Sequence, residues 1–348
     1  MRIATYNVEW FTELFDNSGA LIENETLSGR EGISKSDQLT ALGLVFERMD
    51  ADLVLIVEAP DQSHNRNCVE ALENFAGRFG LRARKGIIGF KNSTQQEIAA
   101  LYDPDKLELQ HDPKGAETGK KGSDEAPRFD GVFRIDLDID ATEDKIVFSK
   151  PPLELAGRTL SGHDFRLIGA HLKSKAPHGA DTEKDAMRFS ISNRRKQLAQ
   201  AIWLRQRIDQ HLENDESLIV LGDLNDGPGL DEYEKLFGRS SVEIIMGVAL
   251  NGDDLPVKKP LFDPHAREGL QSKLGAIPTT ARFFIEQEDR YIQAMLDYIM
   301  LSPDLMAKRP AWRIWHPFDT PECLNDPLML SALLVASDHF PVTLDIDL

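Results

Sequence analysis

Two short apolar runs constrain the fold of this 348-residue chain more than any other feature. The run LVLIV ends at Glu58, and the run LIVL is followed closely by Asp223. Short continuous apolar runs are typical of strands that are buried on both faces. Helical patterns, in which apolar residues recur every three or four positions, occupy residues 37–49, 68–79 and 192–212. The mixture of the two patterns predicts an α/β fold.

Other parts of the sequence predict a helix cap, the domain organisation and further strands. Ser36 is the expected N-cap of the first helix. No linker-like composition divides the chain, so we expect residues 1–348 to form one domain, with loop excursions near 13–36, 111–127 and 240–285. The other expected strands are residues 3–8, 98–102, 132–139, 166–171, 292–301 and 342–346.

The charge balance limits the partners of the chain. It has 40 Lys and Arg against 58 Asp and Glu, which gives a formal charge of −18. Coating DNA through a broad basic surface needs many cations at phosphates, so the charge argues against that function. It leaves room for an enzyme with a few local phosphate contacts, and it fits a site that collects carboxylates around a cation.

Cysteine usage and hydropathy bear on the compartment. Cys68 and Cys323 are far apart in sequence and form neither a disulfide framework nor a paired metal-binding motif. No apolar run approaches the ~18 residues of a membrane span, and the start MRIATYNVEWF lacks the long apolar segment of a signal peptide. We therefore expect a reduced, cytoplasmic protein without membrane insertion.

Polar residues follow the apolar strands at the points where these strands end. Since ligands bind at the carboxyl ends of strands in open α/β sheets, we expect these side chains to share one cleft. A cluster of carboxylates is costly to bury unless a cation compensates it, and oxygen ligands without paired cysteines favour Mg²⁺, with Mn²⁺ as a substitute. A histidine beside a carboxylate can act as a general acid or base near neutral pH. The residues are Asn7, Glu58, His171, Asp223, Asn225, Asp297, Asp338 and His339.

Six segments then resemble, in order, the signatures of the endonuclease/exonuclease/phosphatase superfamily: TYNVEWF, VEAP, HLKSK, GDLND, LDYIMLS and SDHFPV. The resemblance extends from residue 5 to residue 342. It implies a four-layered α/β sandwich of two packed mixed sheets flanked by helices. It also implies Mg²⁺-dependent hydrolysis of phosphoesters by in-line attack of water.

The resemblance assigns a role to each matching residue. Glu58 corresponds to the principal metal ligand, with Asn7 and Asp338 beside it. Asp223 would position or deprotonate the attacking water, and Asn225 would hold a phosphate oxygen. The histidines and their partner are placed as follows: His339 at the scissile phosphate, Asp297 fixing the tautomer of His339, and His171 as proton donor or transition-state stabiliser.

Two further assignments depend on less regular spacing. Glu97 is expected to support His171, as a Glu does in deoxyribonuclease-like members. Arg128 is expected to contact phosphate, although the Pro that usually follows this basic residue is missing. Two motif positions depart from the family pattern: Val57 replaces a Gln beside the metal ligand, and Leu224 replaces a Phe.

The substrate remains open between two classes. An endonuclease acting on DNA is favoured by His171 and by the basic stretch 188–207, which could dock a nucleic-acid backbone although a solvated helix face is the default. A phosphodiesterase or phosphatase for a small-molecule, inositol or lipid phosphoester is favoured by the charge of −18. A scaffold protein with an inactive site is disfavoured because every matched catalytic position is intact.

Overall fold

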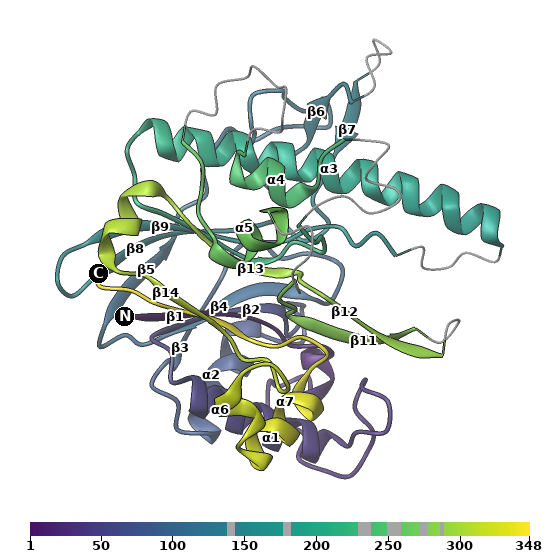
Figure 1. The fold of residues 1–348 in the computed structure, drawn as a ribbon, viewed down its shortest axis with the longest axis vertical. Coiled ribbons are helices and arrows are strands. Elements are labelled where there is room, and N and C mark those ends of the chain that lie inside the picture. Colours follow the sequence, from purple (N-terminus) through teal and green to yellow (C-terminus); the bar gives the residue numbers. More distant parts are fainter. Residues whose placement is uncertain (138–142, 177–181, 229–237, 249–258, 272–276, 286–288) are drawn as a thin grey trace.

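The computed structural model describes residues 1–137, 143–176, 182–228, 238–248, 259–271, 277–285 and 289–348. Within this part of the chain, two large sheets lie face to face, and helices cover the outer side of each (Figure 1). The predicted α/β sandwich of four layers is therefore confirmed.

The first sheet has six strands in the order β14-β15-β1-β2-β4-β3. Its central strands β1 and β2 are parallel, and β15 and β4 flank them in antiparallel pairing, so the sheet is mixed. The strands are β1 (Arg2–Asn7), β2 (Leu53–Ala59), β3 (Lys85–Ile88), β4 (Glu97–Tyr102), β14 (Ala311–Ile314) and β15 (Val342–Asp345).

The second sheet has five strands in the order β13-β10-β9-β8-β5. Here β9 and β10 are the parallel pair, and β13 and β8 flank them in antiparallel pairing. The strands are β5 (Leu107–His111), β8 (Leu153–Thr159), β9 (Asp164–His171), β10 (Leu218–Asp223) and β13 (Asp297–Leu301). Each sheet thus places two parallel strands at its centre, with their carboxyl ends at the same edge.

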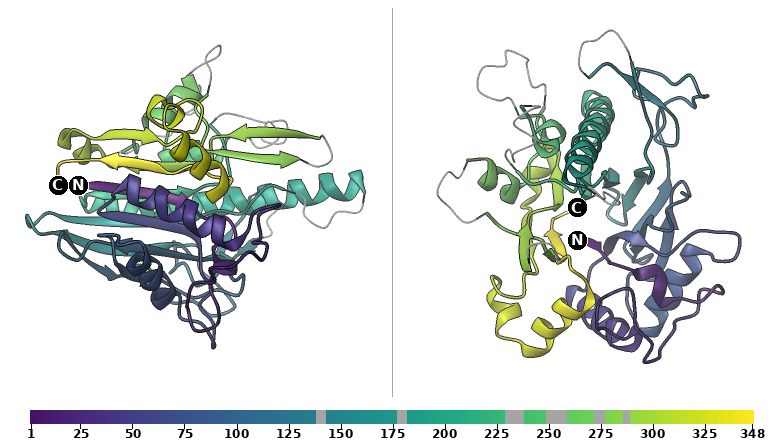
Figure 2. Two further views of the ribbon diagram at one scale, coloured as in Figure 1. Left: turned by 90° about the horizontal axis from the view of Figure 1, so that it is seen from below. Right: turned by 90° about the vertical axis from the view of Figure 1, so that its right-hand side faces the viewer.

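Two hairpins lie outside the large sheets. One pairs β6 (Phe133–Ile135) with β7 (Asp144–Ile146), and the other pairs β11 (Ala281–Ile285) with β12 (Arg290–Ala294). The hairpin β11–β12 projects beyond the ends of the large sheets (Figure 2).

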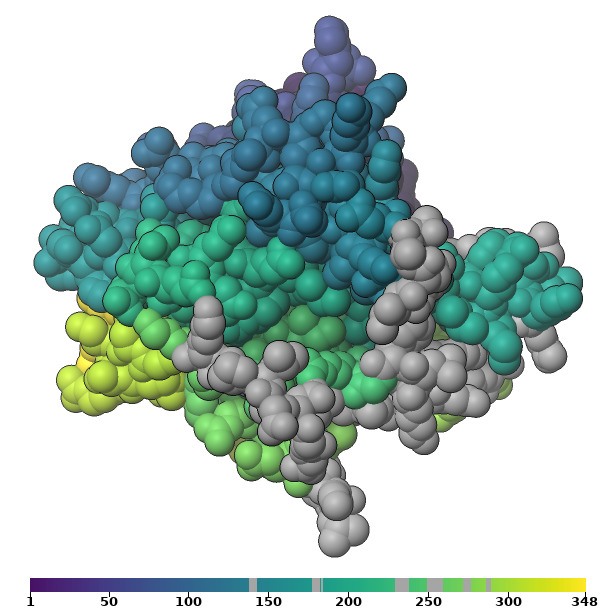
Figure 3. All heavy atoms as spheres, turned by 90° about the horizontal axis from the view of Figure 1, so that it is seen from above, coloured from purple at the N-terminus to yellow at the C-terminus, as the bar shows by residue number. Residues whose placement is uncertain are grey.

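Helices enclose the sandwich from both sides. Those packed on the first sheet are α1 (Lys35–Met49), α2 (Cys68–Arg78), α6 (Pro321–Leu324) and α7 (Pro327–Ala336), with a short 3₁₀ helix at Phe11–Leu14. The long helix α3 (Glu183–Glu213) crosses the outer face of the second sheet with α4 (Ser241–Met246), and its first turns extend past the sheets (Figures 1 and 3). The others are α5 (Pro264–Gln271) and a 3₁₀ helix at Pro303–Lys308.

The core between the sheets is made of fully buried aliphatic side chains from both inner faces, among them Leu55, Leu167 and Ile219. Gly169 allows the close approach of the sheets, since a Cβ atom at this position would lie 2.3 Å from Cδ1 of Leu55. Interiors are close-packed, so a methyl group here would require the side chain of Leu55 to move.

Three sequence expectations need correction. Ser34, rather than Ser36, caps α1, and its hydroxyl accepts a hydrogen bond from the amide of Asp37. The expected strand 292–301 is two strands, β12 and β13, in different sheets. The excursion 240–285 contains α4, α5 and β11 within its described residues.

Candidate active site

The parallel strands bring their last residues together across the two sheets. Asn7 ends β1, His171 ends β9, and Asp223 ends β10. Asp223 lies opposite His171 on one side and Asp297 on the other in the sheet register. Nδ2 of Asn7 donates a hydrogen bond to Oδ2 of Asp223 over 3.0 Å, which links the first sheet to the second. The predicted convergence of strand ends is therefore present in the structure.

A hydrogen-bonded pair sits beside this link. Nδ1 of His339 lies 2.8 Å from Oδ2 of Asp297. The hydroxyl of Thr280 donates to the same carboxylate oxygen over 2.8 Å and accepts from the amide of Asp297. The carboxylate fixes the Nδ1–H tautomer of His339, so Nε2 faces Asp223 at 4.0 Å from Oδ2. The expected pairing of these two residues is thus geometrically met.

The pKa values of Asp223 and His339 are both raised, but for different reasons. The pKa of Asp223 is raised to about 7, first by burial, while His339 opposes the rise and Asp297 adds to it. The pKa of His339 is raised well above its usual value because Asp297, Asp223 and Asp338 favour the imidazolium more than burial disfavours it. A neighbouring acid and base with displaced pKa values are typical of catalytic sites.

Glu58 enters the site through a distortion of its strand. The register of β2 and β4 shifts between Val57 and Ala59, and Glu58 at this β-bulge has a positive φ of 60°. A bulge of this kind redirects one side chain. Nε2 of Gln96, just before β4, donates to Oε2 of Glu58 over 2.7 Å, so it supplies the polar group that Val57 lacks. Burial raises the pKa of Glu58, and Lys150 opposes the rise.

Glu9 is an acid of this site that was not among the predicted residues. Burial raises its pKa to about 7, and the nearby carboxylates of Asp338 and Glu58 add to the rise. Arg30 forms an ion pair with Glu9. Glu9 lies two residues after Asn7 in TYNVEWF, so its place in that motif was the signal that could have identified it.

These oxygen donors fit a divalent cation. Three carboxylates crowd one another, and Oδ1 of Asn7 is buried without a hydrogen-bond partner among the described residues. A hard cation needs such oxygen ligands and would offset the repulsion between the acids. A second group, Asp223, Asp297 and His339, has potential ligand atoms within 4.8 Å of one another. Its histidine and Asp297 are already bonded to each other, so the first group offers the freer ligands.

His171 has a cation as its partner. Nζ of Lys150 lies 3.2 Å from Nδ1 of His171, and Nε2 of His171 lies 3.6 Å from Oδ2 of Asp223. Lys150 Nζ is also 3.5 Å from Nε2, but its shorter contact with Nδ1 and the carboxylate near Nε2 both favour the tautomer that carries its proton on Nε2. The pKa of His171 is lowered well below its usual value by burial and then by Lys150 and His339. Burial also lowers the pKa of Lys150.

The structure does not bring Glu97 or Arg128 into this group. Glu97 accepts hydrogen bonds from the amide of Gln62 and the side chain of Asn92, and its adjacent residue Gln96 faces the site instead. Arg128 makes a bidentate ion pair with Asp130 and another with Glu117. Lys150 is the basic residue that reaches the site.

A sequence signal for Lys150 existed. The expected phosphate-contacting residue is basic and precedes a proline, and Lys150 is followed by Pro151. Arg128 lacks that proline.

Asn225 follows the last strand residue in a tight turn. Its φ is 51°, its amide donates to Oδ1 of Asp223 over 2.7 Å, and its side chain donates to the carbonyl of Leu172 over 3.1 Å. Asn tolerates this left-handed conformation better than most residues. The turn therefore fixes the carboxylate of Asp223 from one side, while Asn7 fixes it from the other.

The basic stretch 188–207 on α3 does not form a free cationic face. Arg194 is fully buried against Asp226, and Arg207 is fully buried against Glu154. Arg195 pairs with Asp144, and Arg205 with Asp209. The two buried arginines stabilise the helix against the sheet, so the default expectation of a solvated helix face is wrong for Arg194 and Arg207.

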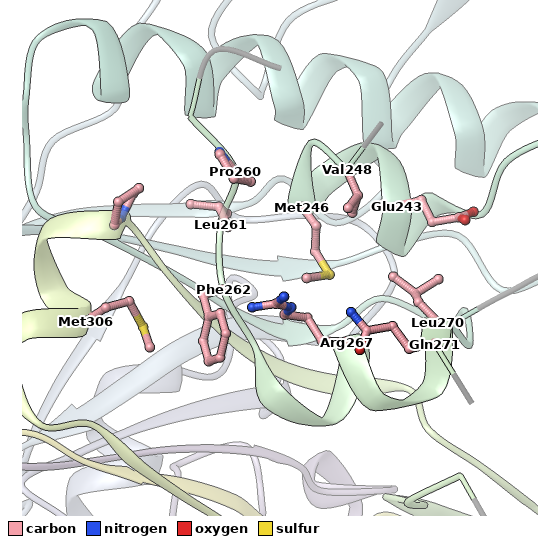
Figure 4. Close-up of a pocket in the computed structure, with 11 residues that line it drawn as sticks. Glu243, Met246, Val248, Pro260, Leu261, Phe262, Arg267, Leu270, Gln271 and Met306 are labelled. Atoms are coloured by element: carbon pink, nitrogen blue, oxygen red, sulfur yellow. The ribbon is translucent and has the colours of Figure 1, made fainter. Parts of the chain in front are cut away.

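A separate cavity of about 760 Å³ lies between α4 and α5 (Figure 4). Met246, Leu261 and Phe262 line it, and the side chain of Arg267 points into it. Phe262 pairs with Leu301, at the opposite end of β13 from Asp297. None of the predicted site residues lines this cavity.

Acids, amides and histidines thus gather at the strand ends of both sheets. Residues 4–339 match the model of the Endonuclease/Exonuclease/phosphatase family. The chain therefore belongs to this family of metal-dependent phosphoester hydrolases. No curated protein matches the sequence.

Solved structures of similar fold share little sequence with the chain. Truncated TDP2 of Caenorhabditis elegans is 14% identical over 100% of this chain and 97% of its own, with a TM-score of 0.48. The 3'-5' exonuclease NExo of Neisseria meningitidis is 14% identical over 100% of both chains, with a TM-score of 0.48. A family protein of Bacteroides thetaiotaomicron is 14% identical over 99% of this chain and 93% of its own, with a TM-score of 0.49.

None of the described helices combines the length and the apolar character that crossing a membrane requires.

Proposed function

We propose that the chain is a Mg²⁺-dependent endonuclease that hydrolyses phosphodiesters of DNA. The observation that carries this proposal is the buried network in which Asp223 lies between the Nε2 atoms of His171 and His339. Phosphodiester hydrolysis needs a group that accepts a proton from water and donors that stabilise charge on the phosphoryl oxygens. This network supplies both within one water-excluded group.

The protonation states support a division of roles. Asp223, with a pKa of about 7, can accept a proton from the attacking water near neutral pH. His339 is held as an imidazolium by Asp297 and would donate from Nε2 to a phosphoryl oxygen. His171 is neutral, and its Nε2–H would stabilise the same developing charge as a hydrogen-bond donor. Asn225 is proposed to hold a further phosphate oxygen once substrate displaces its contact with Leu172.

Glu58, Asp338, Asn7 and Glu9 are the residues proposed to hold the cation. A bound divalent cation supplies positive charge that stabilises the phosphoryl and leaving oxygens. Gln96 holds the carboxylate of Glu58 in place. Lys150 adds a second positive charge beside His171, where the family pattern expects a basic residue at the phosphate.

We also propose that residues 1–348 act as one catalytic domain in the cytoplasm. Both sheets contribute residues to the same site, so neither sheet would be active alone. Cys68 and Cys323 are free and buried, which suits a reducing compartment.

A small-molecule, inositol or lipid phosphoester is the second candidate substrate. The observation that favours it is the burial of Arg194 and Arg207 in internal ion pairs, because fewer cations of the basic stretch then remain for a DNA backbone. The formal charge of −18 also favours this second candidate, because an acidic protein repels a polyanion such as DNA at long range.

Nicking of supercoiled plasmid tests the proposal. Purified protein is assayed with Mg²⁺, with Mn²⁺ and with EDTA, beside the Asp223→Ala variant. Metal-dependent nicking that is lost in the variant supports an endonuclease with this site. Folded, metal-loaded protein that leaves the plasmid intact but hydrolyses a nucleotide, inositol or phospholipid substrate would establish the second candidate instead.

A further inference from the structure

The hairpin β11–β12 is attached directly to the proposed active site. Thr280, just before β11, donates to Asp297, and Ala281 pairs with His339 across a β-bridge. The amide of Arg282 donates to the carbonyl of Asp338 over 2.7 Å. From this attachment the hairpin projects past the carboxyl ends of β1 and β2 (Figures 1 and 2). It therefore stands beside the proposed site.

One face of the hairpin carries exposed aromatic rings. Phe284 lies directly opposite Tyr291, and Arg282 lies opposite Gln293, so alternation places all four side chains on the same face. Phe284 is 42% exposed and Tyr291 is 56% exposed. Their ring centroids are 5.1 Å apart. Exposed aromatic pairs of this kind leave ring faces available to a ligand.

Arg282 adds a positive charge to this face. Its guanidinium carbon lies 3.9 Å from the ring centroid of Tyr291 and 5.7 Å from that of Phe318. Within the described residues, no carboxylate forms an ion pair with Arg282. Most other arginines of the chain have such a partner, for example Arg194, Arg195 and Arg207. A stacked guanidinium without an acid partner is suited to a phosphate of a ligand that stacks on the same rings.

We propose that this face, formed by Arg282, Phe284 and Tyr291, stacks the unpaired bases of a nucleic-acid strand whose scissile phosphate occupies the active site. The inference rests on the proposed function and names its preferred substrate, a single-stranded or frayed strand rather than an intact duplex. Bases that are paired inside a duplex cannot offer their ring faces to a protein surface. Stacking is sequence-tolerant because every base has such a face.

The composition of the hairpin favours nucleic acid over a lipid surface. The sequence that connects the two strands reads Glu286-Gln287-Glu288-Asp289 and carries three acids. A hairpin that inserts into a bilayer places apolar residues at its tip and basic residues behind them. Here the aromatic side chains belong to the strands, with Arg282 nearest the site.

Binding of a fluorescein-labelled single-stranded oligonucleotide tests the inference. It is measured with the full chain carrying Asp223→Ala, so that cleavage does not interfere. Adding Phe284→Ala or Tyr291→Ala should weaken binding by about 5- to 100-fold, the range of one lost base stack. Tyr291→Phe keeps the ring and should bind like the parent. Leu160→Ala is the matched control, because Leu160 is 66% exposed and lies near Met1, at the amino end of β1.

A second ligand separates stacking from other effects. In an oligonucleotide whose central residues lack bases, the parent protein should bind more weakly, and Tyr291→Ala should cause no further loss. Arg282→Gln should lower the slope of log K against log salt concentration by about 0.7, as expected for one lost phosphate contact on a single strand.

Three results would overturn the proposed stacking face. In the first, the parent and the alanine variants bind the oligonucleotide equally. In the second, the alanine substitutions weaken binding equally with and without the central bases. In the third, the protein binds phosphatidylserine or phosphatidylcholine vesicles and Phe284→Ala and Tyr291→Ala abolish that binding. Metal-dependent cleavage of the same single-stranded oligonucleotide by the wild-type protein tells the two proposals apart. Cleavage that these variants do not affect leaves the proposed nuclease intact and removes only the proposed stacking face.

Discussion

Asp223 and Asp226 stand three residues apart in the motif GDLND, and both are buried, but they have different surroundings. Asp226 accepts hydrogen bonds from Arg194 over 2.7 Å, from Lys175 over 3.1 Å and from the amide of Ser241 over 2.7 Å. Asp223 is bound by neutral amide groups, and its nearest positive charge is the imidazolium of His339 at 4.0 Å.

The difference shows how one turn serves structure and chemistry at once. A buried carboxylate with full cationic compensation keeps its charge and holds the fold together. A buried carboxylate with partial compensation has a raised pKa, so it can exchange a proton near neutral pH. Asp226 anchors α3 to the sheet, while Asp223 remains available to substrate.

The largest expected effect comes from removing the reactive carboxylate. Asp223→Asn should lower kcat by about 10²- to 10⁴-fold, as is typical for loss of a general base. The fold should not suffer, because the amide removes a poorly compensated buried charge. Steady-state kinetics and thermal unfolding of the same preparation measure both effects. Near-normal turnover would remove Asp223 from the mechanism, and His339→Ala should show a comparable loss.

Asp226→Ala should act on stability instead. It leaves the fully buried guanidinium of Arg194 without its main partner. Breaking a buried pair from one side costs about 3–5 kcal/mol of unfolding free energy. Urea denaturation measures the loss, and the double variant Arg194→Met/Asp226→Leu should recover part of it. A loss below 1 kcal/mol would contradict the anchoring role.

Two lysines sharpen the comparison further. Lys150 lies at His171, and Lys175 lies at Asp226. Lys150→Met should reduce kcat/KM and raise the pKa of His171, because Lys150 helps to lower that pKa. Lys175 is partly exposed, so Lys175→Met should change stability by no more than about 1 kcal/mol and leave the His171 titration unchanged. NMR titration of His171 distinguishes the two, and identical titration curves in both variants would disprove the Lys150 contact.

Glu97 gives the smallest expected effect. It is a buried acid with amide donors, and burial raises its pKa to about 7. The folded state therefore binds this proton more tightly than the unfolded state. The resulting stability is fully present below the unfolded pKa of roughly 4.3 and is lost as pH rises through about 7. Relative to the Glu97→Gln variant, the wild type should lose on the order of 2 °C in Tm between pH 4.5 and pH 8. A pH-independent difference would argue against this burial effect.

Sequence patterns predicted the strand-end residues well, for a physical reason. Glu58 and Asp223 each follow an apolar run, and buried parallel strands carry their ends to one edge of a sheet. The pairing of Asp297 with His339 followed from the family motifs rather than from any local pattern.

Three site residues were missed, Glu9, Gln96 and Lys150. Successive residues of an extended segment point in opposite directions, so Gln96, just before β4, reaches Glu58, while Glu97, the first residue of β4, hydrogen-bonds with Asn92. Arg128 and Lys150 are both basic, and the proline after Lys150 was the sequence feature that distinguished them. The split of residues 292–301 was not visible in the sequence, because both strands share one β-rich run.

The positive φ of Glu58 has a consequence for the heat resistance of the chain. A left-handed conformation costs a residue with a side chain roughly 1–2 kcal/mol, and glycine avoids that cost. Random substitution filtered only by heat resistance would therefore tend to accept Glu58→Gly. The glutamate at this bulge therefore costs stability that a glycine would save, so heat resistance alone does not account for it.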